Sequence, residues 1–118
     1  MPLLNEGIRY MVETLANRIN VVDFGFSGQT ASETDDGIGQ IATSVTPEVR
    51  VVDDHTISVE AKLPLETTFT QPLKEVVLRY KNPSDATDTT DLFRYTYDAI
   101  TKTSNNEIRF SVFIEVSA

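Results

Sequence analysis

Hydrophobic and polar residues alternate along several segments of the chain, as expected of β-strands that bury one face. The most regular segment is 107–117, where Arg109, Ser111 and Glu115 occupy one face and Phe113 alone departs from the pattern. The apolar face comprises Ile108, Phe110, Val112, Ile114 and Val116. Because a shift of one residue would expose this whole set, the pattern also predicts a well-defined register.

The same alternation predicts earlier strands at about 20–27, 46–52, 55–63, 72–81 and 92–100. Asp53 and Asp54 lie between the second and third of these strands, and aspartate favours tight turns because it bonds to nearby backbone. We therefore expect a β-hairpin there.

The strand predicted at 72–81 divides clearly into two faces. Hydrophobic side chains on its inward face alternate with Glu75, Arg79 and Lys81 on its outward face. Residues 82–85 favour a turn, and the polar run that continues to Asp91 predicts a loop.

An amphipathic helix is predicted over 3–18, ahead of all the strands. Pro2 and Asn5 are typical start signals. Apolar residues recur at three- and four-residue steps and form one stripe, made of Leu4, Ile8, Met11, Val12, Leu15 and Ile19. Because the strands offer apolar faces that need cover, we expect this stripe to pack on a sheet.

These elements predict one α+β domain over 1–118, with the N-terminal helix packed on a mainly antiparallel β-sandwich or open barrel. A long polar loop is expected at 28–44, between the first two predicted strands. Loops of this length in small domains are usually functional, so we expect this one to contact a partner subunit. Its expected interface residues are Glu33, Asp35, Asp36, Ile38 and Ile41.

The composition narrows the classes of function. The chain has 18 acidic and 10 basic residues, a formal net charge of −8 that repels nucleic acid and anionic lipid. It has no cysteine, which excludes disulfides and thiolate metal sites. No segment reaches the ~18 uninterrupted apolar residues of a membrane span, and the N-terminus lacks the pattern of a secretory signal.

The single histidine, His55, stands beside Asp53 and Asp54. A histidine–carboxylate pair can act as a base or bind a metal, but a solvated turn is the favoured interpretation because no second histidine accompanies it. Two aspartate sets resemble sites for hard cations, and neither has the spacing of the twelve-residue calcium loop, so solvated loops are favoured again. These sets are Asp35 with Asp36, and Asp85 with Asp88 and Asp91.

Two further motifs are weak as signs of chemistry. The glycines at 25–39 precede no predicted helix, so they do not form a phosphate-binding loop. Tyr95 and Tyr97 lie two residues apart on a strand and favour a core position over a base-stacking platform, because basic residues do not surround them. The sequence thus predicts no catalytic, cofactor-binding or metal-binding residue, and no enzyme activity.

Four motifs, spread over nearly the whole chain, resemble a family of small tailed-phage virion proteins: the tail-collar or tail-fibre attachment and baseplate modules. Residues 3–11, LLNEGIRYM, are similar to the opening helix motif L-T-N-x-G-R-x-x-L, and 21–28 to a short strand that ends in glycine. Residues 75–80 are similar to the strand motif E-x-G-L-F, with Val77 in place of its glycine. Residues 92–103 match L-F-x-x-x-x-x-x-I-x-K-T, although the last strand lacks a tryptophan.

This resemblance implies a non-enzymatic structural subunit of a phage-like virion, such as a tail, neck or baseplate adaptor that anchors fibres by protein–protein contacts. Its partners would be other virion subunits in a symmetric homo-oligomer or ring, without nucleic acid, membrane insertion, cofactor or small-molecule ligand. It would be made in the host cytoplasm. Because the chain ends where the module ends, a separate adaptor is expected and not a complete fibre. The alternative is a stand-alone carbohydrate- or ligand-binding β-sandwich module.

Overall fold

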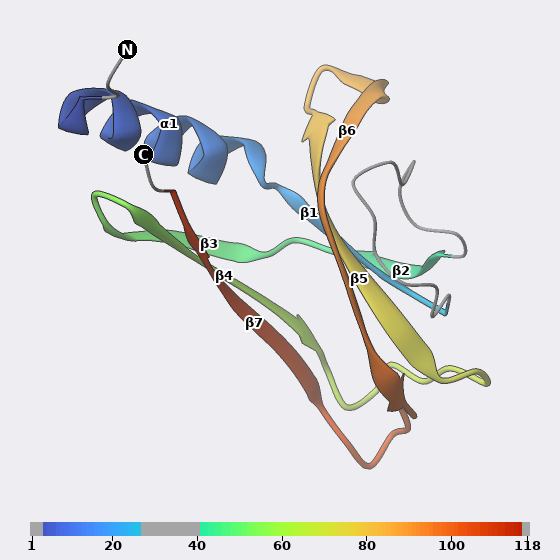
Figure 1. Cartoon of the computed structure of the whole chain (residues 1–118). Coiled ribbons are helices and arrows are strands. Elements are labelled where there is room, and N and C mark those ends of the chain that lie inside the picture. The colour runs from blue at the N-terminus through green and yellow to red at the C-terminus, as the bar shows by residue number, and fades with distance from the viewer. Residues whose placement is uncertain (1–3, 27–40, 117–118) are drawn as a thin grey trace.

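The computed structural model describes residues 4–26 and 41–116, which form one helix and two antiparallel sheets (Figure 1). The elements are α1 (Asn5–Arg18), β1 (Val21–Gly25), β2 (Ile41–Val45), β3 (Glu48–Asp53), β4 (Thr56–Leu63), β5 (Leu73–Asn82), β6 (Asp85–Ile100) and β7 (Ile108–Glu115). This arrangement confirms the predicted α+β class.

The two sheets contain strands that are distant in the sequence. The four-stranded sheet has the order β2-β1-β5-β6, and the three-stranded sheet has the order β3-β4-β7. The chain passes from one sheet to the other after β2, after β4 and after β6. As a result, β6 and β7 are consecutive in the sequence but form edges of different sheets, and the strands lie across from each other (Figure 1).

Helix α1 contacts β3 and β4 of one sheet and β5 of the other. Ile8 and Val12 are buried, whereas Leu4 and Met11 of the predicted stripe are 70% and 48% exposed. The packed stripe is therefore narrower than the sequence predicts. Asn5 begins the helix but does not cap it, because the N-cap residue is Leu4, without a side-chain hydrogen bond.

The end of α1 is fixed to the four-stranded sheet through Asn20. Its side-chain amide donates to the carbonyl oxygen of Lys81 at 2.8 Å and accepts from the amide of Lys81 at 2.8 Å. The guanidinium of Arg18 lies 4.9 Å from the centre of the Tyr80 ring, within the range of a cation–π contact. These contacts set the direction in which the chain enters β1.

Two segments that the sequence predicts to be loops form strands in the structure. β2 begins at Ile41, inside the loop predicted at 28–44, and β6 begins at Asp85, where a loop was predicted to continue to Asp91. The first half of β6 is rich in threonine and aspartate and almost entirely exposed, and β2 is only five residues long, with Thr43 and Ser44 near its centre. Hydrophobic alternation therefore reveals neither strand. Backbone pairing with β1 and β5 makes them strands in spite of this composition.

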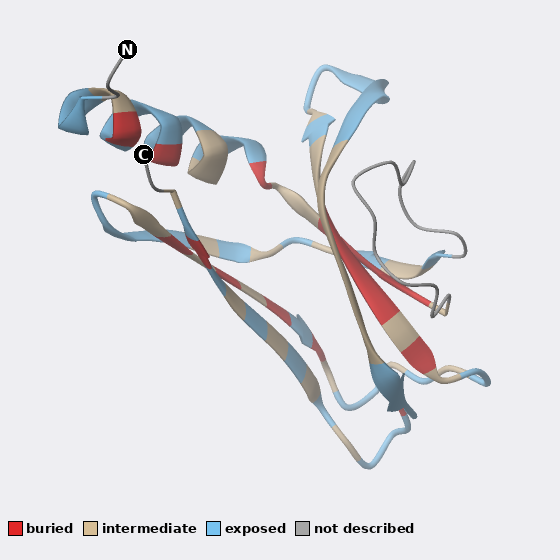
Figure 2. Cartoon of the chain, in the orientation of Figure 1, coloured by how far each residue is buried: buried red, intermediate tan, exposed pale blue. Residues whose placement is uncertain are grey.

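The core lies between the sheets and beneath α1 (Figure 2). Strand β4 alternates buried and less buried residues along its whole length, as its sequence predicts. The inward face of β7 is confirmed too, since its apolar residues from Ile108 to Val116 belong to the core or pack against it, while Phe113 is 70% exposed.

Candidate functional site

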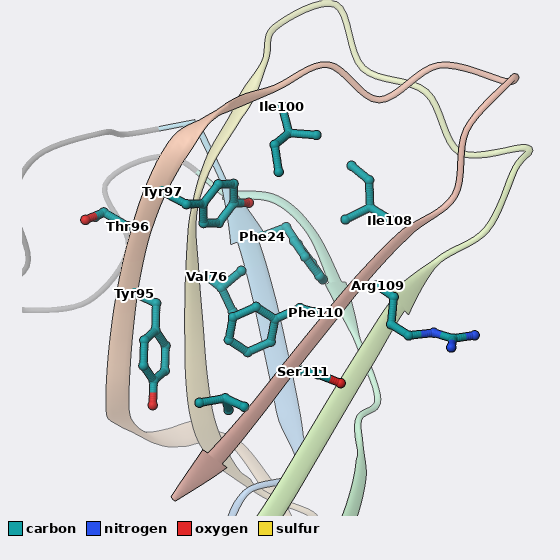
Figure 3. A pocket seen from close by; sticks show the side chains of 11 residues that line it. Phe24, Val76, Tyr95, Thr96, Tyr97, Ile100, Ile108, Arg109, Phe110 and Ser111 are labelled. Atoms are coloured by element: carbon teal, nitrogen blue, oxygen red, sulfur yellow. The ribbon is translucent and has the colours of Figure 1, made fainter.

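A cleft of about 370 Å³, lined mostly by apolar side chains, lies between β6 and β7, where the two sheets meet edge to edge (Figure 3). Phe24 and Val76 lie at its base, because the alternation of β1 and β5 directs them between the sheets. Its walls come from inward-facing residues of β6 and β7, including Tyr95, Tyr97 and Phe110. We refer to this feature as the β6–β7 cleft.

Aromatic side chains define the walls of the β6–β7 cleft. The rings of Tyr95 and Phe110 lie on opposite strands with their centroids 5.6 Å apart. The hydroxyl of Tyr97 points inward and donates to the backbone carbonyl oxygen of Glu75 at 3.4 Å. Arg109 and Ser111 also border the cleft, but their side chains point away from it (Figure 3). The cleft therefore offers apolar and aromatic surface with phenolic groups, which suits recognition of an apolar group.

Burial changes the acidity of both tyrosines. Desolvation raises the pKa of Tyr95. Desolvation, together with the nearby negative charge of Glu75, raises the pKa of Tyr97 to about 12. Both effects disfavour the phenolate, so these tyrosines are hydrogen-bonding and apolar groups at neutral pH.

We expect the stability of the protein to fall as the pH rises from about 10 to about 12. In this window the unfolded Tyr97 has lost its proton and the folded Tyr97 keeps it, so deprotonation favours the unfolded state. Below pH 10 this contribution is constant. Ultraviolet titration of the phenols checks the shift: Tyr97→Phe should remove the latest-titrating component, and an unchanged titration curve would contradict the assignment.

A row of charged and polar side chains crosses the opposite face of the four-stranded sheet. The Arg79 guanidinium contacts the carboxylates of Asp23 and Asp91, each at 2.8 Å. Ser44 donates a hydrogen bond to Asp23. These four residues come from all four strands, and Asp23 is fully buried. The row joins the strands across the sheet, which is a structural role.

A second ion pair on the same face corrects the sequence prediction for Glu75. It was expected to point outward into solvent, but it is fully buried and its carboxylate contacts the Arg94 guanidinium at 2.9 Å. The alternation predicts the correct face of β5, but it does not predict that a charged residue on that face is buried. Val77, which lies two residues after Glu75 on the same face of β5, is buried as well.

Lys102, in the motif I-x-K-T, has a structural role that sequence reasoning missed. It is fully buried, and its ammonium group donates to the backbone carbonyl oxygens of Thr103 at 2.5 Å and Leu65 at 3.4 Å. Its own carbonyl oxygen accepts from the amide of Phe69 at 3.2 Å. Lys102 thus fastens the β6–β7 connection to the β4–β5 connection.

The structure places His55 in the β3–β4 turn, as predicted. The Asp53 carboxylate accepts from the backbone amide of His55 at 2.8 Å, and this hydrogen bond is the main cause of a lowered pKa of Asp53. Asp54 is exposed at the same turn, 3.9 Å from Arg9. These contacts are those of an aspartate-stabilised hairpin turn.

Asp85, Asp88 and Asp91 lie on β6 and not in a loop, and each has a different partner. Asp85 accepts two hydrogen bonds from Thr87, which lower its pKa. Asp88 accepts from the side chain of Asn82 at 3.0 Å, and Asp91 pairs with Arg79. Within 4–26 and 41–116, no group of three or more potential metal ligands comes together.

The predicted interface residues are only partly covered by the structure. Glu33, Asp35, Asp36 and Ile38 lie outside the described residues, as does the Asp35-Asp36 cation candidate. Ile41 begins β2 and is 49% exposed. Tyr95 and Tyr97 face the space between the sheets, in agreement with a core position. The described helix is not long and apolar enough to cross a membrane.

Comparison with known proteins adds no relative: neither a protein-family model, nor a curated protein, nor a solved structure matches the chain.

Proposed function

We propose that this protein is a non-enzymatic structural subunit of a phage-like virion, a tail, neck or baseplate adaptor that anchors fibres by protein–protein contacts. The observation that carries the proposal is the β6–β7 cleft, an apolar seam between two strands that pair on one side only among the described residues. Strand edges and apolar clefts are surfaces through which subunits join.

The charged side chains of the four-stranded sheet fit this proposal, because they contact one another across the strands. Asp23, Arg79 and Asp91 form one connected group, and Glu75 pairs with Arg94. They rigidify the sheet that forms one wall of the cleft. A rigid frame with an open apolar seam suits a subunit that must hold a partner in a fixed position.

The virion assignment draws on the resemblance of four sequence motifs, and the structure gives two of these motifs a physical role. The helix motif supplies Ile8, which is buried against the sheets. The I-x-K-T motif supplies Lys102, which fastens the connection between β6 and β7. The helix motif thus contributes to the core, and the I-x-K-T motif fixes the connection between the two strands that border the cleft.

A second candidate function is a stand-alone module that binds a small ligand with apolar or aromatic groups. The volume of the β6–β7 cleft, about 370 Å³, favours it because small-molecule sites usually begin at about 300 Å³. Such a module would bind its ligand as a free monomer, whereas an adaptor would reside in a particle.

Fractionation of virus-like particles from cells that encode the chain tests the proposal. An antibody against the chain should detect it in purified particles, at an amount that matches a symmetric ring. Detection only in the free protein fraction, at the size of a monomer, would contradict the proposal and favour the ligand-binding module.

Charge substitutions test whether the cleft is the contact. Ile100 lines the cleft and is 40% exposed, so Ile100→Glu should place a charge at its mouth and lower incorporation into particles. The matched control is Thr101→Glu, because Thr101 is exposed and lies next to Ile100, but does not line the cleft. Equal incorporation of the two variants would exclude the cleft as the contact.

A further inference from the structure

Strand β7 is the most regular of the edge strands in the described part of the chain. The pairing of β2 with β1, of β3 with β4 and of β6 with β5 is interrupted by register shifts. In contrast, β7 pairs with β4 without a shift from Leu63–Ile108 to Thr56–Glu115. Proteins commonly protect edge strands with bulges, proline or short length, and β7 has none of these. Its edge is therefore suited to pairing with another strand.

The alternation of backbone hydrogen bonds identifies which residues of β7 face this edge. The amide of Val116 donates to the carbonyl oxygen of His55 at 2.7 Å, on the β4 side. In an antiparallel ladder, alternate residues bond to opposite neighbours. The backbone groups of residues 109, 111, 113 and 115 are thus directed to the edge away from β4.

We propose that two copies of this chain join through antiparallel pairing of β7 with β7 about a two-fold axis at Val112. In this register, Arg109 lies opposite Glu115 of the second copy, and Ser111 lies opposite Phe113 of the second copy. The two three-stranded sheets become one continuous sheet. This proposal rests on the proposed function, which assigns the β6–β7 cleft to contact between subunits. It adds that one of the partners at this cleft is a second copy of the same chain.

Charge complementarity selects this register. Opposite charges directly across two strands stabilise pairing, and like charges oppose it. The symmetry makes the contact between Arg109 and Glu115 occur twice. With Ser111 on the axis instead, Glu107 would lie opposite Glu115 of the second copy. With Phe113 on the axis, the second copy would be shifted along β7, so that Arg109 would no longer lie directly opposite Glu115 of the second copy.

Arg109 is available for this contact. Its guanidinium lies 3.4 Å from Glu60 and 3.7 Å from Glu107, and its side chain is 56% exposed. Exposed ion pairs of this kind contribute little to stability, so they do not compete strongly with a contact across the dimer.

The same register joins the apolar faces of the two copies. Phe110 would lie opposite Ile114 of the second copy, and the two Val112 side chains would meet at the axis. These side chains face the same side as the β6–β7 cleft, so the second strand would lie beside the open seam. On the outer face, Phe113, which is 70% exposed, would gain Ser111 of the second copy as a cross-strand neighbour. A dimer therefore buries surface that the monomer leaves in water.

Sedimentation of the full chain and its variants tests the proposal. The wild-type chain should sediment as a dimer. Ser111→Pro should be monomeric, because the lost amide faces the free edge and not β4. Arg109→Glu should weaken the dimer about tenfold, since two attractive pairs become repulsive. The matched control Arg50→Glu makes the same change in net charge on β3 and should not alter the dimer.

A charge exchange separates a lost contact from a damaged fold. The double variant Arg109→Glu with Glu115→Arg restores opposite charges across the axis and should recover the dimer. Thermal unfolding of each variant monitors folding. A monomeric wild type, or an Arg109→Glu variant that dimerises as well as Arg50→Glu, would overturn the proposal. Particle fractionation is a separate readout, so a monomer that still enters particles would refute this dimer and leave the proposed function standing.

Discussion

Phe24→Ala should lower the free energy of unfolding by roughly 3–5 kcal/mol, the range for removing a buried phenylalanine ring. Phe24 is fully buried on β1, which lies between β2 and β5 in the four-stranded sheet. Its ring forms part of the base of the β6–β7 cleft. The substitution removes apolar contacts and deepens a space that the neighbouring strands are not free to close. Denaturant unfolding at low protein concentration gives the value.

Tyr10→Ala is the matched control for Phe24→Ala, because Tyr10 is an aromatic residue that is 71% exposed on α1. Its substitution should change the free energy of unfolding by no more than about 0.5 kcal/mol. Similar losses for the two variants would show that Phe24 is not at the centre of the core. Phe110→Ala should lie between them, since Phe110 is only partly buried at the cleft wall.

Arg79→Met should lower the free energy of unfolding by about 3 kcal/mol, near the low end of the range for breaking a buried ion pair. Asp23 is fully buried and would lose its cationic partner, while Asp91 would lose the same guanidinium. Methionine keeps much of the volume of the arginine side chain, so the loss of unfolding free energy reports mainly on the missing positive charge. Denaturant unfolding is again the measurement.

Arg50→Met provides the comparison for Arg79→Met. Arg50 contacts Glu48 at 2.9 Å, but both side chains are largely exposed. A surface ion pair contributes about 0–1 kcal/mol. If the free energy of unfolding falls equally little in both arginine variants, the ion pairs of Arg79 do not hold the four-stranded sheet together as we describe.

The sequence predicts well those strands whose two faces have opposite character. Strand β7 has apolar residues at alternate positions, and its inward face is as expected. The limits of β4 are also close to prediction, at Thr56 and Leu63. In both strands one face contacts the core and the other is mostly polar, so hydrophobic alternation carries the required information.

The sequence does not reveal contacts between residues that lie far apart along the chain. Alternation cannot show that Asp23 meets Arg79, because their pairing depends on β1 lying beside β5. It cannot reveal the β6–β7 cleft either, since the cleft depends on how two sheets meet. The polar first half of β6 is strand because β5 pairs with it, which overrides local composition.

The central claim is that the β6–β7 cleft, with the free edge of β7 beside it, is a protein contact surface in a particle. Hydrogen exchange of β7 in the free chain and in purified particles tests it most directly. We predict that the amides of residues 109, 111, 113 and 115 exchange rapidly in the free chain diluted below its dimerisation range and become protected in the particle. Equal exchange of these amides in both states, with the chain present in the particle, would contradict the claim.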